Sequence, residues 1–320
     1  VGTFMREWLS LYDSKSGERG FYSSMSAQKH VESLNNREKD KDGVYIQRRM
    51  AREDFGTNPC SEIILRSREF CNLSEVVLRS DDTIKSISDK IRIATILGTF
   101  QSTLTNFKYL SREWKRNCDE ERLLGVSLTG IMDCPLTNGA NGPDELEKTL
   151  IKLREVAVGT NKEWAETLGI PRSAAITCVK PSGTVSQLVD SASGIHARHN
   201  PYYIRTVRAD NKDPLCRMMK EQGFPNEPDV TKPDHTTVFS FPSKSPEGAT
   251  CRNEMSAWKQ LSLWHTYAKH WCEHKPSVTV SVKEDEWVDT ASWVYANFDD
   301  ISGISFLPFS DHTYQQAPYQ

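Results

Sequence analysis

The feature that most constrains the fold of this chain is the alternation of short apolar strands with amphipathic helices. Residues 81–108 carry isoleucine and leucine at a spacing near 3.6, which predicts a helix with one apolar face. Residues 123–130 form a short apolar run ending at glycine, which predicts a buried strand and a turn. Repeated alternation of this kind predicts an α/β fold. Further strands are predicted at residues 71–78, 174–179 and 278–282, and further helices at residues 145–168 and 287–298.

Composition excludes several classes of protein. The 320 residues suffice for one large domain or two ordinary ones. The chain has 40 basic and 43 acidic residues, so we expect no nucleic-acid partner. No apolar run approaches the ~20 residues of a membrane span, so we expect no membrane partner. The eight cysteines include no Cys-x-x-Cys pair, which argues against a zinc knuckle and makes a reducing cytoplasmic location the simplest one.

The run Asn58-Pro59-Cys60-Ser61-Glu62 places an amide, a thiol and a carboxylate at alternate positions. Pro59 disfavours a helix at this point, so we predict an extended segment. Side chains at i, i+2 and i+4 of a strand share one face, so the three groups could meet one small molecule. On spacing alone, the more frequent arrangement is a small buried cysteine beside a surface glutamate.

A second candidate segment, Lys180–Gln187, follows the predicted strand 174–179. Small hydroxyl residues around Gly183, before a predicted helix, are typical of a phosphate site, because amide groups at a helix start are unsatisfied. The alternative is an ordinary helix capped by Ser182 or Thr184. A Walker A loop is excluded, because its lysine and second glycine are missing.

These two segments together resemble those of a known enzyme family. The run Gly56–Glu62 with Cys71-Asn72-Leu73 resembles the active-site loop of ribonucleotide reductases, and Pro181–Ser186 resembles their substrate phosphate loop. The resemblance extends from about residue 16 to residue 320. Three further runs are similar to the adenosylcobalamin-dependent, single-chain branch that reduces ribonucleoside triphosphates: Gly194–Arg205, Phe306–Pro308 and Gln316–Tyr319.

The resemblance implies a role for each matched residue. Cys60 matches the cysteine that becomes a thiyl radical and abstracts the 3′ hydrogen of the ribose, and Glu62 matches the base that takes the 3′-hydroxyl proton. Asn58 matches the amide that binds the ribose hydroxyls, and Cys71 matches one of the two thiols that reduce the 2′ carbon. The residues implied to bind the substrate phosphates are Ser182, Gly183, Thr184, Val185 and Ser186.

The resemblance also implies a cofactor and partners. Adenosylcobalamin is the implied cofactor, and it keeps its own base on the cobalt, since Asp311-His312 lacks the Asp-x-His-x-x-Gly spacing. A ribonucleoside triphosphate is the implied substrate, and thioredoxin or another dithiol the implied reductant. His270 and His274 are spaced i, i+4, but a half-buried amphipathic helix is the more frequent arrangement, so no metal site is predicted.

The resemblance implies one incomplete catalytic domain over residues 1–320. We expect the second half of a ten-stranded α/β barrel, with its active-site loop at about 55–75 and its phosphate loop at about 180–187. No cysteine precedes Cys60, so the partner thiol of Cys71 is expected in the remaining part of the reductase, and the chain alone is expected to be inactive.

Three alternatives stay open at this point. The chain could belong to a metal-tyrosyl (class I) or glycyl-radical (class III) branch with the same barrel. It could be a non-catalytic nucleotide-binding fragment, although the set Asn58, Cys60, Glu62 and Cys71 is complete. An interaction protein is the third alternative, and nothing in the composition favours it.

Overall fold

The computed structural model describes residues 1–15, 20–51, 54–309 and 315–320. The residues Asp311-His312, considered above, lie outside these ranges. The helices are α1 (Gly2–Ser14), α2 (Ser24–Asn35), α3 (Ile84–Gln101), α4 (Arg112–Glu121), α5 (Pro143–Leu168), α6 (Thr184–Leu188), α7 (Pro214–Glu221), α8 (Ala257–His270) and α9 (Trp287–Ala296). The strands are β1 (Gly20–Tyr22), β2 (Gly56–Thr57), β3 (Ile64–Leu65), β4 (Asn72–Val77), β5 (Leu124–Thr129), β6 (Thr177–Cys178), β7 (Tyr202–Asp210), β8 (Asn226–Pro228), β9 (Thr236–Lys244), β10 (Thr279–Val282) and β11 (Gly303–Pro308).

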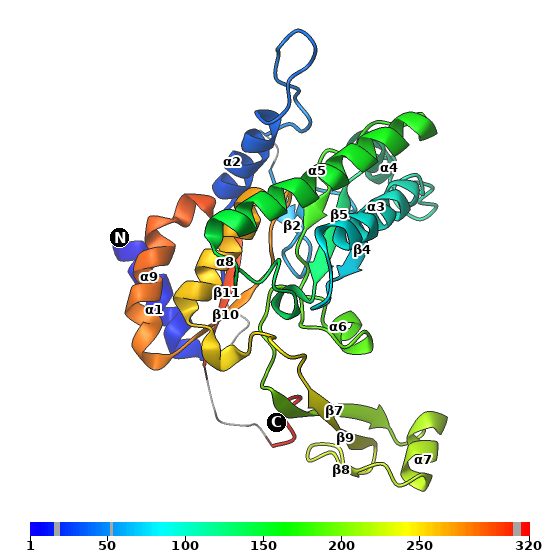
Figure 1. The fold of residues 1–320 in the computed structure, drawn as a ribbon, viewed down its shortest axis with the longest axis vertical. Coiled ribbons are helices and arrows are strands. Elements are labelled where there is room, and N and C mark those ends of the chain that lie inside the picture. Colours follow the sequence, from blue (N-terminus) through cyan, green and yellow to red (C-terminus); the bar gives the residue numbers. More distant parts are fainter. Residues whose placement is uncertain (16–19, 52–53, 310–314) are drawn as a thin grey trace.

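A wall of parallel strands forms the centre of the molecule (Figure 1). Strands β4, β5 and β6 pair in that order, and β10 pairs in parallel with β11. A parallel bridge between Val179 and Pro276 connects the end of β6 to the segment before β10. Strand β1 pairs antiparallel with β11 at the far edge. The wall therefore runs β4-β5-β6-β10-β11-β1, and its first five strands are parallel.

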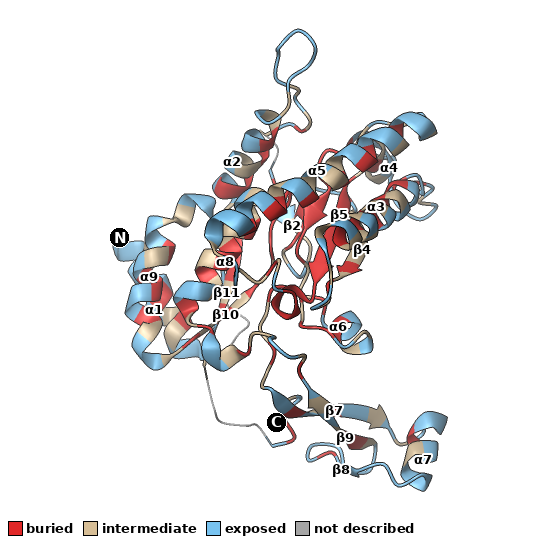
Figure 2. Cartoon of the chain, viewed as in Figure 1, coloured by how far each residue is buried: buried red, intermediate tan, exposed pale blue. Residues whose placement is uncertain are grey.

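Helices cover much of the wall, because apolar helical faces follow several of its strands. All six residues of β5 are buried, as expected for a parallel strand covered on both sides. Helix α3 begins with a capping box between Thr83 and Ser86, and buries Ile87 and Ile91 against the sheet. Figure 2 shows the buried residues concentrated in the central strands, while the outer faces of α3 and α5 are exposed.

Aromatic side chains fix the other end of the wall. The ring of Trp8 on α1 lies 5.6 Å from that of Trp287 on α9 and 5.0 Å from that of Phe306 on β11, measured between centroids. Phe21 of β1 stacks on Trp8 at 6.0 Å. Edge and stacked aromatic pairs of this kind add to the burial energy, so α1 and α9 are held firmly against β11 and β1.

The predicted α/β class and most predicted elements are confirmed. The helix predicted for residues 81–108 is shorter than expected, because Thr103 and Leu104 donate to carbonyls three residues back and form turns after Gln101. The strand predicted for residues 174–179 is confirmed only in part, as β6 and the bridge at Val179. Helix α4 and the segment from β7 to β9 were not predicted.

The segment from β7 to β9 projects from the body of the molecule (Figure 1). It is an antiparallel sheet of order β7-β9-β8 with α7 at its tip. The end of the chain returns to this sheet, because Ile204 and Thr206 donate backbone hydrogen bonds to Gln320 and Pro318. The projection leaves the central wall open to the site described below.

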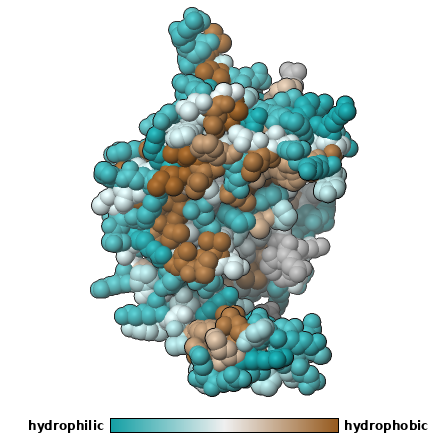
Figure 3. Space-filling view, turned by 90° about the vertical axis from the view of Figure 1, so that its right-hand side faces the viewer, coloured by the Kyte–Doolittle hydropathy of each residue, from teal (hydrophilic) through white to brown (hydrophobic). Residues whose placement is uncertain are grey.

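The surface carries a considerable amount of exposed apolar area. Figure 3 shows a band of hydrophobic surface on one face, among hydrophilic groups. On α3, exposed apolar side chains recur at helical spacing at Ile93, Leu97 and Phe100, and Leu104 is exposed in the turn that follows. A search of the described residues finds no helix that is both long and apolar enough for a membrane span.

Candidate active site

The loop between β2 and β3 forms a tight turn, so the prediction of an extended segment at Asn58–Glu62 is wrong. Ser61 donates its amide hydrogen to the carbonyl of Asn58 at 2.8 Å and has a φ of +63°. Asparagine followed by proline suits the first two positions of a β-turn, and this signal was available in the sequence. The turn separates the side chains that alternation would have aligned: Cys60 is exposed, whereas Glu62 is fully buried.

We call residues 58–64, which include the first residue of β3, the Cys60 loop. The segment just before β10 holds it through backbone contacts. Ser277 Oγ donates to the carbonyl of Cys60 at 2.6 Å, and the Lys275 amide donates to the carbonyl of Glu62 at 3.2 Å. Within the loop, Asn58 Oδ1 accepts from the Ile63 amide at 3.0 Å. The side-chain oxygen of Asn58 is therefore engaged in the loop, while its Nδ2 group stays available as a donor.

A buried histidine extends this support to the sheet. The amide of Ile64 donates to His274 Nδ1 at 3.3 Å, so Nε2 carries the proton and donates to the carbonyl of Leu124 at 2.9 Å. Burial lowers the pKa of His274 well below its usual value, and nearby Arg49 acts in the same direction. His274 is thus a neutral link between the Cys60 loop and β5.

The position of His274 shows that the i, i+4 pair of His270 and His274 does not lie on one helix. Helix α8 ends at His270, so His274 lies beyond the helix and does not share a helical face with it. His270 instead faces Glu147, with 3.6 Å between Nδ1 and Oε1. The residues that the structure describes contain no group of three or more His, Cys, Asp or Glu side chains that could hold a metal ion.

The carboxylate of Glu62 is paired on one side only. Its Oε1 lies 3.3 Å from Lys180 Nζ. Its Oε2 is buried and has no hydrogen-bond partner among the described residues. Burying an unpartnered carboxylate oxygen costs free energy, so Oε2 is a strong acceptor for a hydroxyl group that enters the site.

Cys71 lies beneath the loop, on the sheet. A side chain at Gly125 of β5 would place its Cβ 3.2 Å from Cys71 Sγ, 2.4 Å from Leu73 and 3.0 Å from Ile63 of the loop. Glycine at this position therefore lets the Cys60 loop and Cys71 approach the sheet together. Burial raises the pKa of the Cys71 thiol well above its usual value, and the charge of Glu62 raises it further.

One cavity of about 290 Å³ is lined by Pro59, Cys60 and Ser61 of the first candidate segment and, of the second, by Pro181. Gly183 and Gln187 line another cavity, of about 350 Å³, which Pro181 also lines. Lys180 connects the two candidate segments, because it belongs to the second and its side chain contacts Glu62 of the first. Its amide donates to Ser127 Oγ at 2.8 Å. Residues about 120 positions apart in the sequence thus share one site.

We call residues 181–187 the Ser182 loop. Helix α6 begins after Gly183 with no side-chain cap, so the alternative of a helix capped by Ser182 or Thr184 is wrong. Ser182 is buried with a φ of +67°, and its Oγ has no partner among the described residues. Ser186 Oγ donates to the carbonyl of Gly183, whereas Thr184 and Val185 are exposed.

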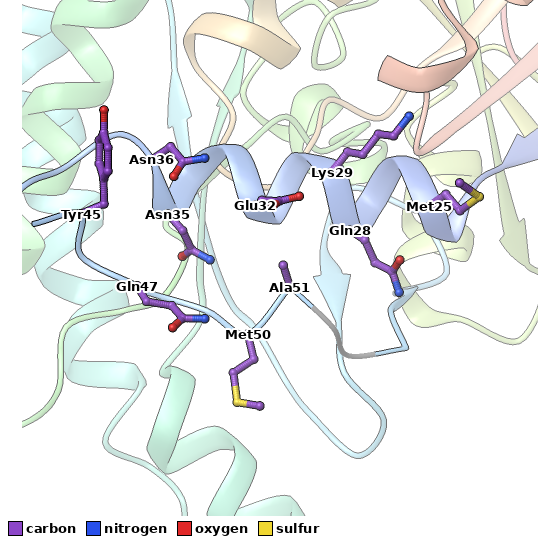
Figure 4. A pocket seen from close by; sticks show the side chains of 10 residues that line it. All are labelled: Met25, Gln28, Lys29, Glu32, Asn35, Asn36, Tyr45, Gln47, Met50 and Ala51. Carbon is purple, nitrogen blue, oxygen red and sulfur yellow. The ribbon is translucent and has the colours of Figure 1, made fainter.

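A larger cavity than the one at Cys60 lies elsewhere. It measures about 1010 Å³ and is lined by residues of α2 and of the segment that follows it (Figure 4). None of the candidate site residues lines it, and its charged groups are Lys29 and Glu32. It brings together amides and methionines but no thiol, so the smaller cavity at Cys60 is the better candidate for chemistry.

Sequence reasoning missed several residues that this site depends on. Lys180, His274, Lys275 and Ser277 all contact the Cys60 loop. Lys180 directly precedes the predicted phosphate segment, so its position was a usable signal. The other three lie more than 200 residues after the loop, and only the tertiary structure brings them to it.

Comparison with known structures defines the class of protein. The chain superposes on a B12-dependent (class II) ribonucleotide reductase with a TM-score of 0.72 and 24% identity, over 83% of this chain and 40% of that one. The alpha subunit of the class Id ribonucleotide reductase of Actinobacillus ureae gives 0.64 and 15% identity, over 96% and 61%. The fold is that of a ribonucleotide reductase catalytic chain.

Sequence relatives narrow this assignment. No protein-family model matches the chain. It is 30% identical to a probable adenosylcobalamin-dependent ribonucleoside-triphosphate reductase of Dictyostelium discoideum, over 84% of this chain and 35% of that one. The corresponding reductases of Levilactobacillus brevis and Euglena gracilis are 29% and 28% identical, over 82% and 83% of this chain. The chain is therefore a homologue of the adenosylcobalamin-dependent ribonucleoside-triphosphate reductases, and it spans little more than a third of their length.

Proposed function

We propose that this chain is the part of a reductase that converts ribonucleoside triphosphates into 2′-deoxyribonucleotides by thiyl-radical chemistry. One observation carries the proposal. The exposed thiol of Cys60 and the buried, half-paired carboxylate of Glu62 belong to one loop, and Cys60 lines a cavity together with Pro181, the first residue of the Ser182 loop. The names of the homologous reductases support the same chemistry.

The proposed roles balance as follows. A thiyl radical at Cys60 takes the 3′ hydrogen atom of the ribose, and Glu62 Oε2 takes the 3′-hydroxyl proton. The 2′-hydroxyl leaves as water with a proton from a thiol. Cys71 and a second thiol outside this chain supply two electrons and the hydrogen that replaces the hydroxyl on the 2′ carbon, and end as a disulfide. Cys60 then returns its hydrogen atom to the 3′ carbon, Glu62 returns its proton to the 3′ oxygen, and Asn58 Nδ2 holds a ribose hydroxyl throughout.

The Ser182 loop is the proposed phosphate site. The unpartnered Oγ of Ser182 and the exposed Thr184 support this role, since both can donate to phosphate oxygens. Gly183 has no atom within 4 Å of where a Cβ would lie, so its backbone is open to a ligand. We assign the phosphate contacts to Ser182, Gly183, Thr184, Val185 and Ser186.

Adenosylcobalamin is the proposed cofactor. This chain would need to offer the cofactor a contact surface beside the Cys60 thiol. The exposed thiol of Cys60, between Pro59 and the cavity shared with Pro181, fits that requirement. When bound, the cofactor supplies the one-electron oxidation of the Cys60 thiol.

We further propose that residues 1–320 form one incomplete catalytic barrel. Five parallel strands support half of a ten-stranded barrel, and the exposed apolar band supports a missing remainder. That remainder supplies the second thiol. Thioredoxin or another dithiol re-reduces the disulfide, which places the enzyme in the cytoplasm.

The test is a reconstitution. The chain is mixed with the rest of the reductase polypeptide, adenosylcobalamin, a ribonucleoside triphosphate and dithiothreitol, and deoxynucleotide is measured by chromatography. We expect product and a radical signal by electron paramagnetic resonance in the parent, and neither in Cys60→Ser. Equal product from both proteins would overturn the proposal, and product from the 320-residue chain alone would overturn its incompleteness.

A further inference from the structure

Lys275 is a buried lysine without an ion pair among the described residues. Its exposed fraction is 2%, and its Nζ donates to Ser61 Oγ and to the carbonyl of Gly303, both at 2.8 Å. Burial lowers its pKa to about 7, while the charges of Glu62 and Cys272 oppose that shift. An apolar residue would fill this space at lower cost, so the fold alone gives no reason for an amine here.

The contacts of Lys275 are concentrated on one short stretch of the Cys60 loop. Its backbone amide binds the carbonyl of Glu62, and Ser277, two residues on, binds the carbonyl of Cys60. Between these two points, the Lys275 amine binds the side chain of Ser61. Ser61 has a φ of +63°. A residue other than glycine adopts this backbone conformation mainly where neighbouring groups hold it.

The surrounding strand leaves space for this contact. A Cβ on Gly303 of β11 would lie 2.2 Å from Lys275 Nζ and 2.7 Å from Ser61 Oγ. Gly303 pairs with Tyr22 of β1, so its carbonyl is fixed in the wall of strands. The amine therefore ties the tip of the Cys60 loop to a rigid strand.

We propose that Lys275 is a positioning residue, whose amine holds Ser61 against Gly303 and thereby fixes the separation between the Cys60 thiol and the Glu62 carboxylate. This inference rests on the function proposed above for those two residues. Hydrogen abstraction acts on the 3′ carbon of the ribose and proton removal on its hydroxyl group, so a displacement of about 1 Å at either catalytic group costs on the order of 100-fold in rate.

Three variants and a control test the role. Lys275→Met removes the donor and keeps the length of the stem, Lys275→Gln keeps a donor with a shorter reach, and Ser61→Ala removes the acceptor without changing the buried lysine. The control is Lys152→Met, which changes an exposed lysine on α5. If Lys275→Met does not fold, Ser61→Ala carries the test, because Ser61 is only partly buried.

The first measurement is amide hydrogen exchange in the 320-residue chain, which needs neither cofactor nor turnover. We expect exchange at residues 60–63 to rise about 10-fold in Lys275→Met and Ser61→Ala, with β5 unchanged. Lys152→Met should match the parent. Unchanged exchange in the loop of both variants would overturn the positioning role.

The second measurement is steady-state kinetics in the reconstituted reductase. We expect kcat to fall about 10- to 100-fold in Lys275→Met, KM to stay within about 2-fold, and Lys275→Gln to recover part of kcat. A rise in KM with unchanged kcat, or a kcat equal to that of Lys152→Met, would overturn the inference while the parent stays active. An inactive parent would instead refute the proposed function, and the exchange result would then decide the positioning of the loop separately.

Discussion

The Cys60 loop and the Ser182 loop adjoin one cavity, through Cys60 and Pro181, but are held in different ways. The Cys60 loop is bound by groups more than 200 residues away: Ser277, Lys275 and His274. The Ser182 loop is bound mostly by itself, since Gly183 and Val185 donate to the carbonyls of Pro181 and Ser182.

This difference suits the two chemical tasks proposed for these loops. A group that abstracts a hydrogen atom must be held within a few tenths of an ångström, which requires a network of fixed partners. A loop that receives phosphates needs exposed donors that can close around a ligand, and Thr184 and Val185 are exposed. The comparison predicts large effects of substitutions around the Cys60 loop and small ones around the Ser182 loop.

The largest effect is expected from Glu62→Gln. Glutamine keeps the volume but cannot accept a proton as a base, so turnover should fall by about 10²- to 10⁴-fold at unchanged KM. The measurement is deoxynucleotide formation in the reconstituted reductase, with Glu166→Gln on the exposed face of α5 as control. Turnover within about 3-fold of the parent would remove Glu62 from the chemistry.

His274→Ala should cause the largest loss of stability. It removes two buried hydrogen bonds, to Ile64 and Leu124, and leaves a cavity, so the free energy of unfolding should fall by about 2–4 kcal/mol. Urea denaturation of the chain measures this, with His235→Ala at an exposed position as control. A loss equal to that of the control would show that the loop does not depend on this link.

Gly303→Ala should destabilise the chain by about 1–3 kcal/mol, because the new methyl group overlaps Lys275 and Ser61. Gly159→Ala is the matched control. It lies inside α5 with no atom within 4 Å of the new Cβ, and should stabilise the chain by about 0.5–1 kcal/mol. Thermal unfolding measures the change in stability of both variants. Equal shifts in Tm would contradict the close contact at Gly303.

The pKa of Lys275 predicts a pH dependence of stability. The folded chain releases the lysine proton at about pH 7, whereas the unfolded chain keeps it up to about 10.5. Between these values the unfolded state binds more protons, so the free energy of unfolding should rise with pH, by up to about 1.4 kcal/mol per unit. Denaturation of the parent and of Lys275→Met between pH 7 and 8.5 gives the slope of the free energy of unfolding against pH for each protein. The contribution of Lys275 is the difference between the two slopes. A difference of zero would show that the amine is not desolvated.

The smallest effect is expected from Thr184→Ala. Its side chain is exposed, so stability should change by less than about 0.5 kcal/mol. Loss of one hydrogen bond to a phosphate should raise KM by about 5- to 10-fold at unchanged kcat. Kinetics at several substrate concentrations separate KM from kcat, and an unchanged KM would remove Thr184 from the phosphate site.

Much of the architecture could be predicted from the sequence. The 3.6 spacing of apolar residues predicted α3 and α5, the apolar run at 123–130 predicted β5, and a strand was also predicted at 71–78, where β4 lies. The segment from β7 to β9 was not predicted, since its strands are partly exposed and pair across α7 and β8.

For the candidate site, the sequence by itself determined which chemical groups are present: the thiols of Cys60 and Cys71, the carboxylate of Glu62 and the hydroxyl residues of the Ser182 loop. The sequence predicted the wrong backbone conformation for the segment that holds Cys60 and Glu62. A strand and a β-turn both accept Asn-Pro, and contacts outside the segment favour the turn. Only the tertiary structure decided that Cys60 is exposed, that Glu62 is buried beside Lys180, and that Lys275 reaches Ser61. The physical reason is that these contacts join residues more than 100 positions apart, and no local pattern encodes which strand edge will lie beside which loop.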